Sequence, residues 1–121
     1  MRLLFVCVGN SCRSQMAEGL ARTMGHIADS AGTHPSSPTI ASNAKKYLDS
    51  RGISSEGMAP KSVDNFSAED YDMVISMGCG VYCPSMRIDE DWELEDPVGR
   101  KYEFYKSTAE EIERRLKLLE Q

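Results

Sequence analysis

Apolar and polar positions alternate in blocks along this chain, and each block has the spacing of one kind of secondary structure. Residues 2–8 form a largely apolar, β-branched run, which is typical of a strand buried on both faces. Within residues 14–24, methionine and leucine recur at four-residue spacing, as on one face of a helix, and Gly25 provides a stop. The small and polar residues 9–14 are therefore predicted to connect a strand to a helix.

The remaining blocks predict three more strands and two more helices. The strands are residues 27–31, residues 71–77 and a short segment within residues 87–94. Ser37 followed by Pro38 has the pattern of an N-cap and a first helical position, which predicts a helix from there to about Arg51. The end of the chain predicts a last helix that begins at or before the capping-box pattern of residues 107–110. Residues 67–70 predict a short turn or helix.

This order of elements predicts a single α/β domain over residues 1–121. Strands that alternate with helices build a parallel sheet, here of four strands, with helices on both faces, so we expect a three-layer sandwich. In such sheets ligands bind beyond the carboxyl ends of the strands, where the loop of residues 9–14 would lie. A chain of 121 residues can form its own core without a metal or disulfide.

Net charge and hydropathy disfavour several classes of function. With 14 basic and 19 acidic side chains the net charge is −5, which disfavours a general binder of nucleic acid or of anionic membranes. No apolar run approaches the roughly 18 residues that span a bilayer, and a strand at the start leaves no room for a signal peptide. We therefore expect a cytoplasmic protein with reduced cysteines. A small anionic substrate is compatible with the negative net charge, because one binding site can be locally positive.

The loop after the first strand has the composition of an anion-binding site with a nucleophile. A short loop that leads into a helix turns its backbone N–H groups inward, and Gly9 and Asn10 tolerate the positive φ angles that such loops need. The guanidinium of Arg13 can hold a tetrahedral oxyanion through two parallel hydrogen bonds. Cys7 would face the same N–H groups, which stabilise a thiolate, and Ser14 could hydrogen-bond that thiolate.

Two alternatives exist for this loop. Cys7 could be a buried strand cysteine followed by an ordinary turn into a helix, with no ligand. The loop could also be a glycine-rich nucleotide site, although it has neither a G-x-G-x-x-G pattern nor a Walker lysine. The residues around the Cys-x5-Arg spacing favour the oxyanion site over both.

A second pair of cysteines, Cys79 and Cys83, follows the third predicted strand and so belongs to the same edge of the sheet as Cys7. Cysteines near an oxyanion site suggest redox chemistry, because thiols can supply the two electrons of a reduction. Residues four apart lie one turn apart on a helix, so a modest rearrangement could join this pair. The alternatives are packing of buried thiols, and a zinc site in which Cys12 would join the other three cysteines.

The sequence of the loop resembles that of a known enzyme family. Residues 7–18 read Cys-Val-Gly-Asn-Ser-Cys-Arg-Ser-Gln-Met-Ala-Glu, which is similar to the anion loop of the low-molecular-weight protein tyrosine phosphatase superfamily, and within it to the thioredoxin-coupled arsenate reductases. The resemblance covers nearly the whole chain and continues at residues 30–32, 64–65, 76–79 and 92–97. It implies the strand order 2-1-3-4, and we expect a monomer. It also implies an oxyanion-binding loop made of Val8, Gly9, Asn10, Ser11, Cys12 and Arg13.

The resemblance further implies a cysteine relay that reduces arsenate. Cys7 would attack arsenate, Cys79 would attack Cys7 and release arsenite, and Cys83 would then attack Cys79. A thioredoxin-like dithiol would reduce the resulting Cys79–Cys83 disulfide, and no cofactor is required. Only three residues separate this pair, fewer than in the arsenate reductases that the chain resembles. The pair could therefore belong to a shorter branch of the family or play another role.

The dipeptide of Asp96 and Pro97 resembles the general acid of the phosphatases, and Trp92 upstream extends the match. A carboxylic acid over the loop could protonate the oxygen that leaves the substrate. Phosphatases of this family place aromatic residues after that proline, whereas Val98 and Gly99 follow here. This difference disfavours a phosphotyrosine specialist.

Four more residues match a potassium site that some arsenate reductases of the family have behind the loop. They are Asn10, Glu18, Ser30 and Asp64, whose oxygen atoms suit a hard cation. Asn10 and Ser30 could instead hold the loop in shape by hydrogen bonds, without any ion. Cys12 resembles the second loop cysteine of the phosphatases, which can form a protective disulfide with the nucleophile, or it could simply pack in the loop.

Three functions fit these residues. Arsenate reduction through Cys7, Cys79 and Cys83 is the leading hypothesis. A phosphatase that acts on aryl or protein phosphotyrosine would need only Cys7, Arg13 and Asp96. A non-enzymatic oxyanion or redox sensor would bind arsenate or oxidise once, without turnover when a reductant is supplied.

Overall fold

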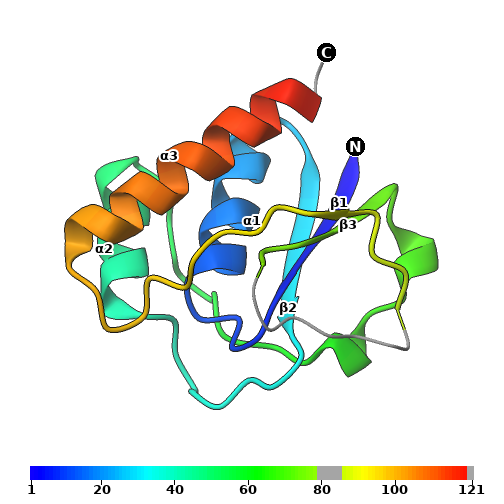
Figure 1. Cartoon of the computed structure of the whole chain (residues 1–121), viewed down its shortest axis with the longest axis horizontal. Helices are drawn as coiled ribbons and strands as arrows, with labels where there is room; N and C mark the ends of the chain where they lie inside the picture. Colours follow the sequence, from blue (N-terminus) through cyan, green and yellow to red (C-terminus); the bar gives the residue numbers. More distant parts are fainter. Residues whose placement is uncertain (79–85, 120–121) are drawn as a thin grey trace.

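The structure is a computed structural model, and it describes residues 1–78 and 86–119. Its strands are β1 (Arg2–Cys7), β2 (Ile27–Gly32), β3 (Met73–Ser76) and β4 (Glu90–Asp91). They pair in parallel in the order β2-β1-β3-β4, which confirms the predicted four-stranded sheet and its strand order (Figure 1). Cys79 and Cys83 lie outside the described residues.

Among the described residues, three α-helices pack on one face of the sheet and two 3-10 helices pack on the other (Figure 1). They are α1 (Arg13–Thr23), α2 (Ser42–Ser50) and α3 (Tyr102–Leu119), with η1 (Val63–Asn65) and η2 (Ala68–Asp70) opposite. Side chains of β1 alternate between the faces, because a strand has a period of two. Leu3 and Phe5 pack with the α-helices, whereas Leu4 and Val6 pack on the side of η1 and η2. This is the predicted three-layer sandwich.

The register of the sheet brings several chain segments together at its carboxyl edge. Cys7 of β1 lies opposite Gly32 of β2, and Val6 lies opposite Ser76 of β3. The loop after β1 and the segment after β2 therefore begin side by side at this edge, which is where a parallel sheet binds its ligands.

The second helix begins later than predicted. α2 starts at Ser42, after the non-helical Ala41, and Ser37 lies in the segment before it. The Ser37 hydroxyl bonds locally, donating to the Thr39 carbonyl at 2.9 Å. The backbone N–H of Ala41 donates to the Ser11 carbonyl at 2.8 Å, which ties this segment to the loop after β1. The predicted helix start at Ser37 was wrong, because the chain turns into a helix only once it has passed this loop.

The last helix begins at Tyr102, ahead of the capping-box pattern at residues 107–110. The Thr108 hydroxyl of that pattern donates to the Phe104 carbonyl at 2.9 Å, so it bonds inside the helix and caps no helix start. Ile112 of this helix is fully buried in the core.

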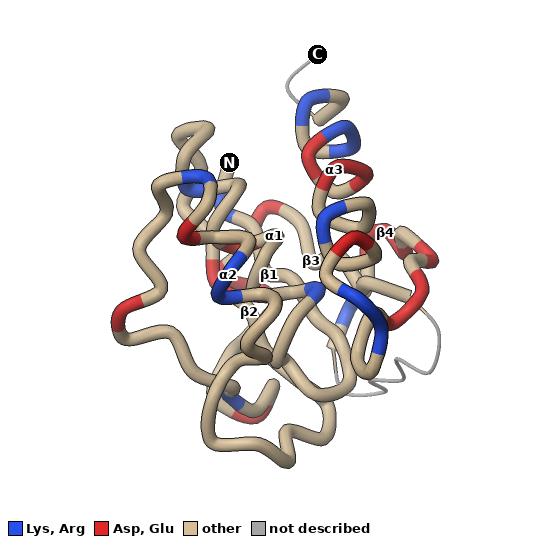
Figure 2. Tube along the Cα trace, turned by 90° about the vertical axis from the view of Figure 1, so that its left-hand side faces the viewer, with Lys and Arg blue, Asp and Glu red and all other residues tan. Residues whose placement is uncertain are grey.

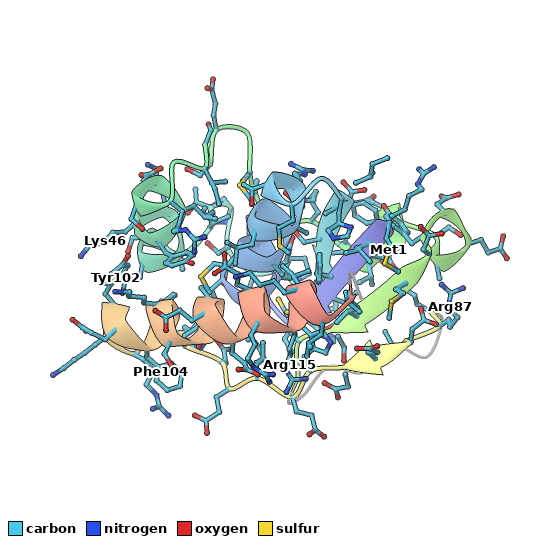
Figure 3. All side chains as sticks on the ribbon, turned by 90° about the horizontal axis from the view of Figure 1, so that it is seen from above. Met1, Lys46, Arg87, Tyr102, Phe104 and Arg115 are labelled. Atoms are coloured by element: carbon cyan, nitrogen blue, oxygen red, sulfur yellow. The ribbon has the colours of Figure 1, made fainter. Side chains whose placement is uncertain are left out.

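The outer surface carries charges of both signs, and Figure 2 shows basic and acidic positions interspersed along α3. Hydrogen bonds from Arg114 and from Arg115 lower the pKa of the Glu111 carboxyl to about 2. The Lys46 ammonium of α2 lies 4.2 Å from the centre of the Tyr102 ring and joins α2 to the start of α3 (Figure 3). No helix among the described residues is long and apolar enough to cross a membrane.

Candidate active site

Cys7 lies at the carboxyl end of β1 and is 1% exposed. Its Sγ is 2.8 Å from the Ser14 hydroxyl and accepts a hydrogen bond from the Asn10 N–H at 3.1 Å. Asn10 has a φ of 53°, the left-handed conformation expected of a residue in an anion-binding turn, whereas Gly9 does not use it. The structure thus brings Cys7, Asn10 and Ser14 into one cluster, with donors placed to stabilise negative charge on the sulfur.

Asn10 is held by several partners. Its side-chain amide donates to the Ser14 hydroxyl at 2.7 Å, and its Oδ1 accepts from the Lys61 backbone N–H at 2.8 Å. Gln15 Nε2 lies 3.1 Å from both oxygens of Asn10 and 3.0 Å from the Ala59 carbonyl. These bonds fix a left-handed backbone that an L-residue rarely adopts. Sequence reasoning gave no role to Gln15 or Lys61, although Gln15 lies within the recognised loop pattern.

The loop packs closely on the end of β2. A Cβ on Gly32 would lie 2.7 Å from the Val8 carbonyl oxygen and 3.0 Å from the Asn10 Cβ. The next two residues along the chain donate their backbone N–H groups to the carbonyls of Cys7 and Val8, at 3.0 and 2.8 Å. Glycine is required here because any side chain would push the loop away.

Arg13 is the first residue of α1, and it is 2% exposed. Its Nη1 donates to the Leu94 carbonyl at 2.9 Å, and its Nη2 lies 3.8 Å from the Asp96 carboxylate. Within the described residues, Arg13 Nε is buried without a hydrogen-bond partner. A buried guanidinium with an unsatisfied N–H, in the same pocket as Cys7, is suited to hold an oxyanion.

Asp96 lies between β4 and α3, and its side chain is 51% exposed. One carboxylate oxygen accepts from the Val98 N–H at 3.0 Å and faces the Cys12 thiol, which donates to it at 3.6 Å. Burial, followed by the charges of Asp96 and Cys7, raises the pKa of Cys12 to about 12. Cys12 is therefore a neutral thiol at pH 7, in contact with the candidate acid.

These residues share one pocket of about 240 Å³. Its lining consists of Cys7, Val8, Gly9, Asn10, Ser11, Cys12, Arg13, His34, Ser36, Asp96 and Val98. His34 and Ser36 were not predicted. Both follow β2, the neighbour of β1 in the sheet, so the common edge of the two parallel strands could have pointed to them.

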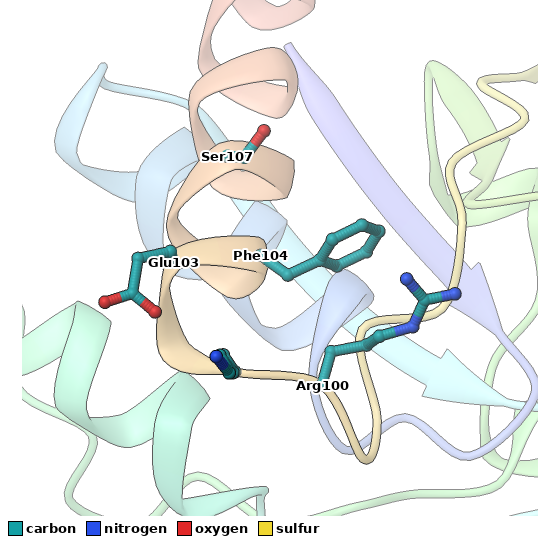
Figure 4. Close-up of a pocket in the computed structure, with 5 residues that line it drawn as sticks. Arg100, Glu103, Phe104 and Ser107 are labelled. Carbon is teal, nitrogen blue, oxygen red and sulfur yellow. The ribbon is translucent and has the colours of Figure 1, made fainter.

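A larger hollow of about 650 Å³ lies at the start of α3. Its lining residues are Arg100, Lys101, Glu103, Phe104 and Ser107 (Figure 4). The Arg100 guanidinium stands over the Phe104 ring, 4.7 Å from its centre. Among the described residues no cysteine or histidine lines it, so the smaller pocket at Cys7 is the candidate active site.

The predicted potassium site consisted of Asn10, Glu18, Ser30 and Asp64. Ser30 Oγ donates to Glu18 Oε1 at 3.0 Å, and the Glu18 carboxylate also faces Arg22 at 3.3 Å and Lys61 at 4.0 Å. The Asn10 oxygens accept from N–H groups, and Asp64 is exposed on η1. Because Glu18 and Asn10 are already matched by donors of the chain, these residues do not fit an added cation.

Two of the four cysteines, Cys7 and Cys12, lie within the described residues. Cys7 and Cys12 are both free thiols and both belong to the anion loop. Among residues 1–78 and 86–119, no group of three or more histidine, cysteine, aspartate or glutamate side chains could hold a metal ion. Cys79 and Cys83 lie outside the described residues, and their roles stay predictions.

Comparison with known proteins agrees with this geometry. The family model for low molecular weight phosphotyrosine protein phosphatase matches residues 2–121. A Synechocystis protein named glutaredoxin arsenate reductase is 39% identical over 98% of this chain and 95% of its own length. A solved structure described as an arsenate reductase in the phosphate binding state has a TM-score of 0.87 at 39% identity, over 98% of this chain and 95% of that one.

Phosphatases are also similar to this chain. The solved low molecular weight protein tyrosine phosphatase from T. tengcongensis has a TM-score of 0.75 at 32% identity, over 98% of this chain and 97% of that one. The family model matches nearly the whole length of the chain, and relatives above 30% identity share its fold. The chain belongs to the low molecular weight phosphotyrosine protein phosphatase family.

Proposed function

We propose that this protein is an arsenate reductase. The observation that carries the proposal is a buried cysteine, Cys7, in an anion-binding loop, with Arg13 and Asp96 lining the same pocket. Arsenate has the shape and charge of phosphate, so a pocket built for one tetrahedral oxyanion suits the other. The arsenate reductases that are 39% identical to this chain support this choice of substrate.

In the first step the Cys7 thiolate attacks the arsenic atom of bound arsenate and displaces one oxygen. Backbone N–H groups of the loop and the Arg13 guanidinium hold the remaining oxygens and their charge. Asp96 gives its proton to the departing oxygen, which leaves as water, and an S–As bond forms with arsenic still pentavalent. Ser14, 2.8 Å from the sulfur, stabilises the thiolate before the attack and again when it departs.

The second step transfers two electrons to arsenic. The Cys79 thiolate attacks the Cys7 sulfur, the S–As bond breaks, and its electron pair stays on arsenic, which leaves as trivalent arsenite. The Cys83 thiolate then attacks Cys79, which frees Cys7 and leaves a Cys79–Cys83 disulfide. The support for this relay is the sequence: two cysteines separated by three residues, after the strand that pairs with β1.

An external dithiol restores the enzyme. A thioredoxin-like protein would reduce the Cys79–Cys83 disulfide by two further thiol exchanges, in a cytoplasm that keeps the relay thiols reduced. The name of the Synechocystis relative makes a glutaredoxin the competing reductant. The steps proposed for the chain itself use only its own backbone and side-chain groups.

Turnover assays of variants test this function. With arsenate and a thioredoxin system, we expect the wild-type protein to release many arsenites per chain, and Cys7→Ser to release none. A parallel assay with glutathione and glutaredoxin identifies the reductant. Cys79→Ser should lose reduction because it lacks the resolving thiol. Continued turnover by Cys79→Ser would overturn the relay, and no arsenite from the wild type with either reductant would overturn arsenate reduction.

The second candidate is a phosphatase for aryl phosphates, supported by the similarity to the T. tengcongensis enzyme. It would need only Cys7, Arg13 and Asp96, with water hydrolysing the phosphorylated cysteine. Val98, which follows the acid and lines the pocket, is an exposed aliphatic residue and offers no ring to stack on tyrosine. We therefore expect only weak aryl phosphatase activity, and Cys79→Ser should retain it. A sensor would oxidise once and would not turn over with a reductant.

A further inference from the structure

We propose that the ammonium group of Lys61 acts as an internal cation that supports the anion loop and makes a bound potassium ion unnecessary. This inference deepens the proposed function, since it rests on the same anion loop. It does not depend on arsenate as the substrate, because it concerns how the loop is held and applies to any oxyanion.

The charge that needs a partner is the Glu18 carboxylate of α1, whose side chain is only 3% exposed. A buried carboxylate is costly unless it is paired and hydrogen-bonded. Its partners are the Ser30 hydroxyl at 3.0 Å, Arg22 Nη1 at 3.3 Å and Lys61 Nζ at 4.0 Å. Burial raises the pKa of Glu18, and Arg22, Lys61 and Ser30 oppose this rise. Lys61 is thus one of two cations that offset the cost of burying this carboxylate.

Lys61 also connects this carboxylate to the anion loop. Its backbone N–H donates to Asn10 Oδ1 at 2.8 Å, and its carbonyl accepts from the Gly32 N–H at 2.7 Å, at the end of β2. Its Nζ is anchored by donating to the Ala59 carbonyl at 3.0 Å. One residue therefore contacts the loop through its main chain and the buried Glu18 through its side chain. A shift of Lys61 would be passed to Asn10, whose N–H faces the nucleophile.

The two oxygen atoms of Asn10 and the Ala59 carbonyl already have N–H partners. Gln15 Nε2 occupies the point where two Asn10 oxygens and the Ala59 carbonyl converge. A potassium ion could reach these oxygens only by displacing that amide. These three oxygen atoms are therefore committed to the chain's own nitrogen atoms.

The balance of charge around Glu18 depends on Lys61. A pocket of about 280 Å³ opens here, and its charged lining residues are Glu18, Arg22, Asp29, Glu56 and Lys61. Without the Lys61 ammonium, three carboxylates would face a single guanidinium. Such a site would attract a cation from solvent, since carboxylate oxygens are preferred ligands of hard cations.

The test replaces Lys61 by methionine, which keeps the aliphatic stem and the backbone N–H but removes the charge. Lys45→Met is the matched control, because Lys45 is 59% exposed and pairs with Asp49 on the surface of α2. Calorimetry measures the binding of inorganic phosphate in potassium chloride and in choline chloride at equal ionic strength. Phosphate binding reports on the loop alone, so the result is independent of whether the protein reduces arsenate.

We expect the wild type and Lys45→Met to bind phosphate within about twofold in the two salts. Lys61→Met should bind about tenfold more weakly in choline chloride, which corresponds to about 1.4 kcal/mol, and should regain most of that affinity in potassium chloride. If Lys61→Met does not fold, Lys61→Gln replaces it with the same expectations.

Three results would overturn the inference. The first is a wild-type protein that binds phosphate more than about fivefold better in potassium than in choline, because the chain would then still need the ion. The second is a Lys61 variant that binds like the wild type in choline. The third is a weakened Lys61 variant that potassium does not rescue.

Discussion

Gly32 lies where the anion loop packs on β2, and its replacement by alanine would disturb the loop from behind. The added methyl group would lie 2.7 Å from the Val8 carbonyl oxygen and 3.0 Å from the Asn10 Cβ. Ordinary contacts begin at 3.4 Å, so the loop would have to move by about 0.7 Å. The Val8 carbonyl is also bonded to the His34 N–H, so it cannot yield without moving the loop backbone.

Two effects of Gly32→Ala are expected. Forcing a methyl group into a packed site costs about 1–3 kcal/mol of unfolding free energy. Misplacing a binding group by about 1 Å can cost about 100-fold in rate. A displacement of about 0.7 Å should therefore lower both the phosphate affinity and kcat/KM for arsenate by about 10- to 100-fold.

Urea unfolding and phosphate calorimetry measure these two effects separately. Gly25→Ala is the control, because Gly25 has a φ of 91° and no heavy atom within 4 Å of an added Cβ. It should lose about 1–2 kcal/mol of stability through backbone strain and keep its phosphate affinity. A Gly32→Ala protein that binds phosphate within about twofold of the wild type would refute the view that packing on β2 shapes the loop.

Two further predictions concern the acid and the second loop cysteine. Asp96→Asn should lower kcat for arsenate by about 100-fold, because the departing oxygen loses its proton donor. In steady-state assays, a decrease in kcat of less than about threefold would exclude Asp96 as the acid. Folding raises the pKa of the Cys12 thiol from 9.0 to about 12. As the pH rises above about 9, the unfolded chain therefore loses this proton before the folded protein does, and the free energy of unfolding should fall. Cys12→Ser should make this fall shallower in urea titrations between about pH 8 and pH 10.5, and equal slopes for both proteins would contradict the burial of a neutral thiol.

The strand–loop–helix unit around Cys7 could be predicted from sequence because its signals are local. A continuous apolar run and a four-residue repeat depend only on neighbouring positions. The structure gives β1 as Arg2–Cys7 and α1 as Arg13–Thr23, within one residue of the predicted bounds. Once the alternation of strands and helices is recognised, the sheet edge at which this loop lies follows as well.

The supports of the loop could not be predicted, because they depend on contacts between distant segments. Lys61 donates to Asn10 across 51 positions of the sequence, and neither residue type indicates the other. The start of α2 depends in the same way on the bond from Ala41 to Ser11. His34 enters the pocket only because β2 pairs with β1 in register, so that the two strands end together.

A single turnover without reductant tests arsenate reduction most directly. Fully reduced protein is mixed with arsenate, quenched with a thiol-alkylating agent, and its disulfides are mapped by peptide mass spectrometry. We predict a Cys79–Cys83 disulfide that forms only when arsenate is present, with about one arsenite released per chain. Four alkylated cysteines and no arsenite, from protein shown to be folded, would contradict the relay and favour the phosphatase.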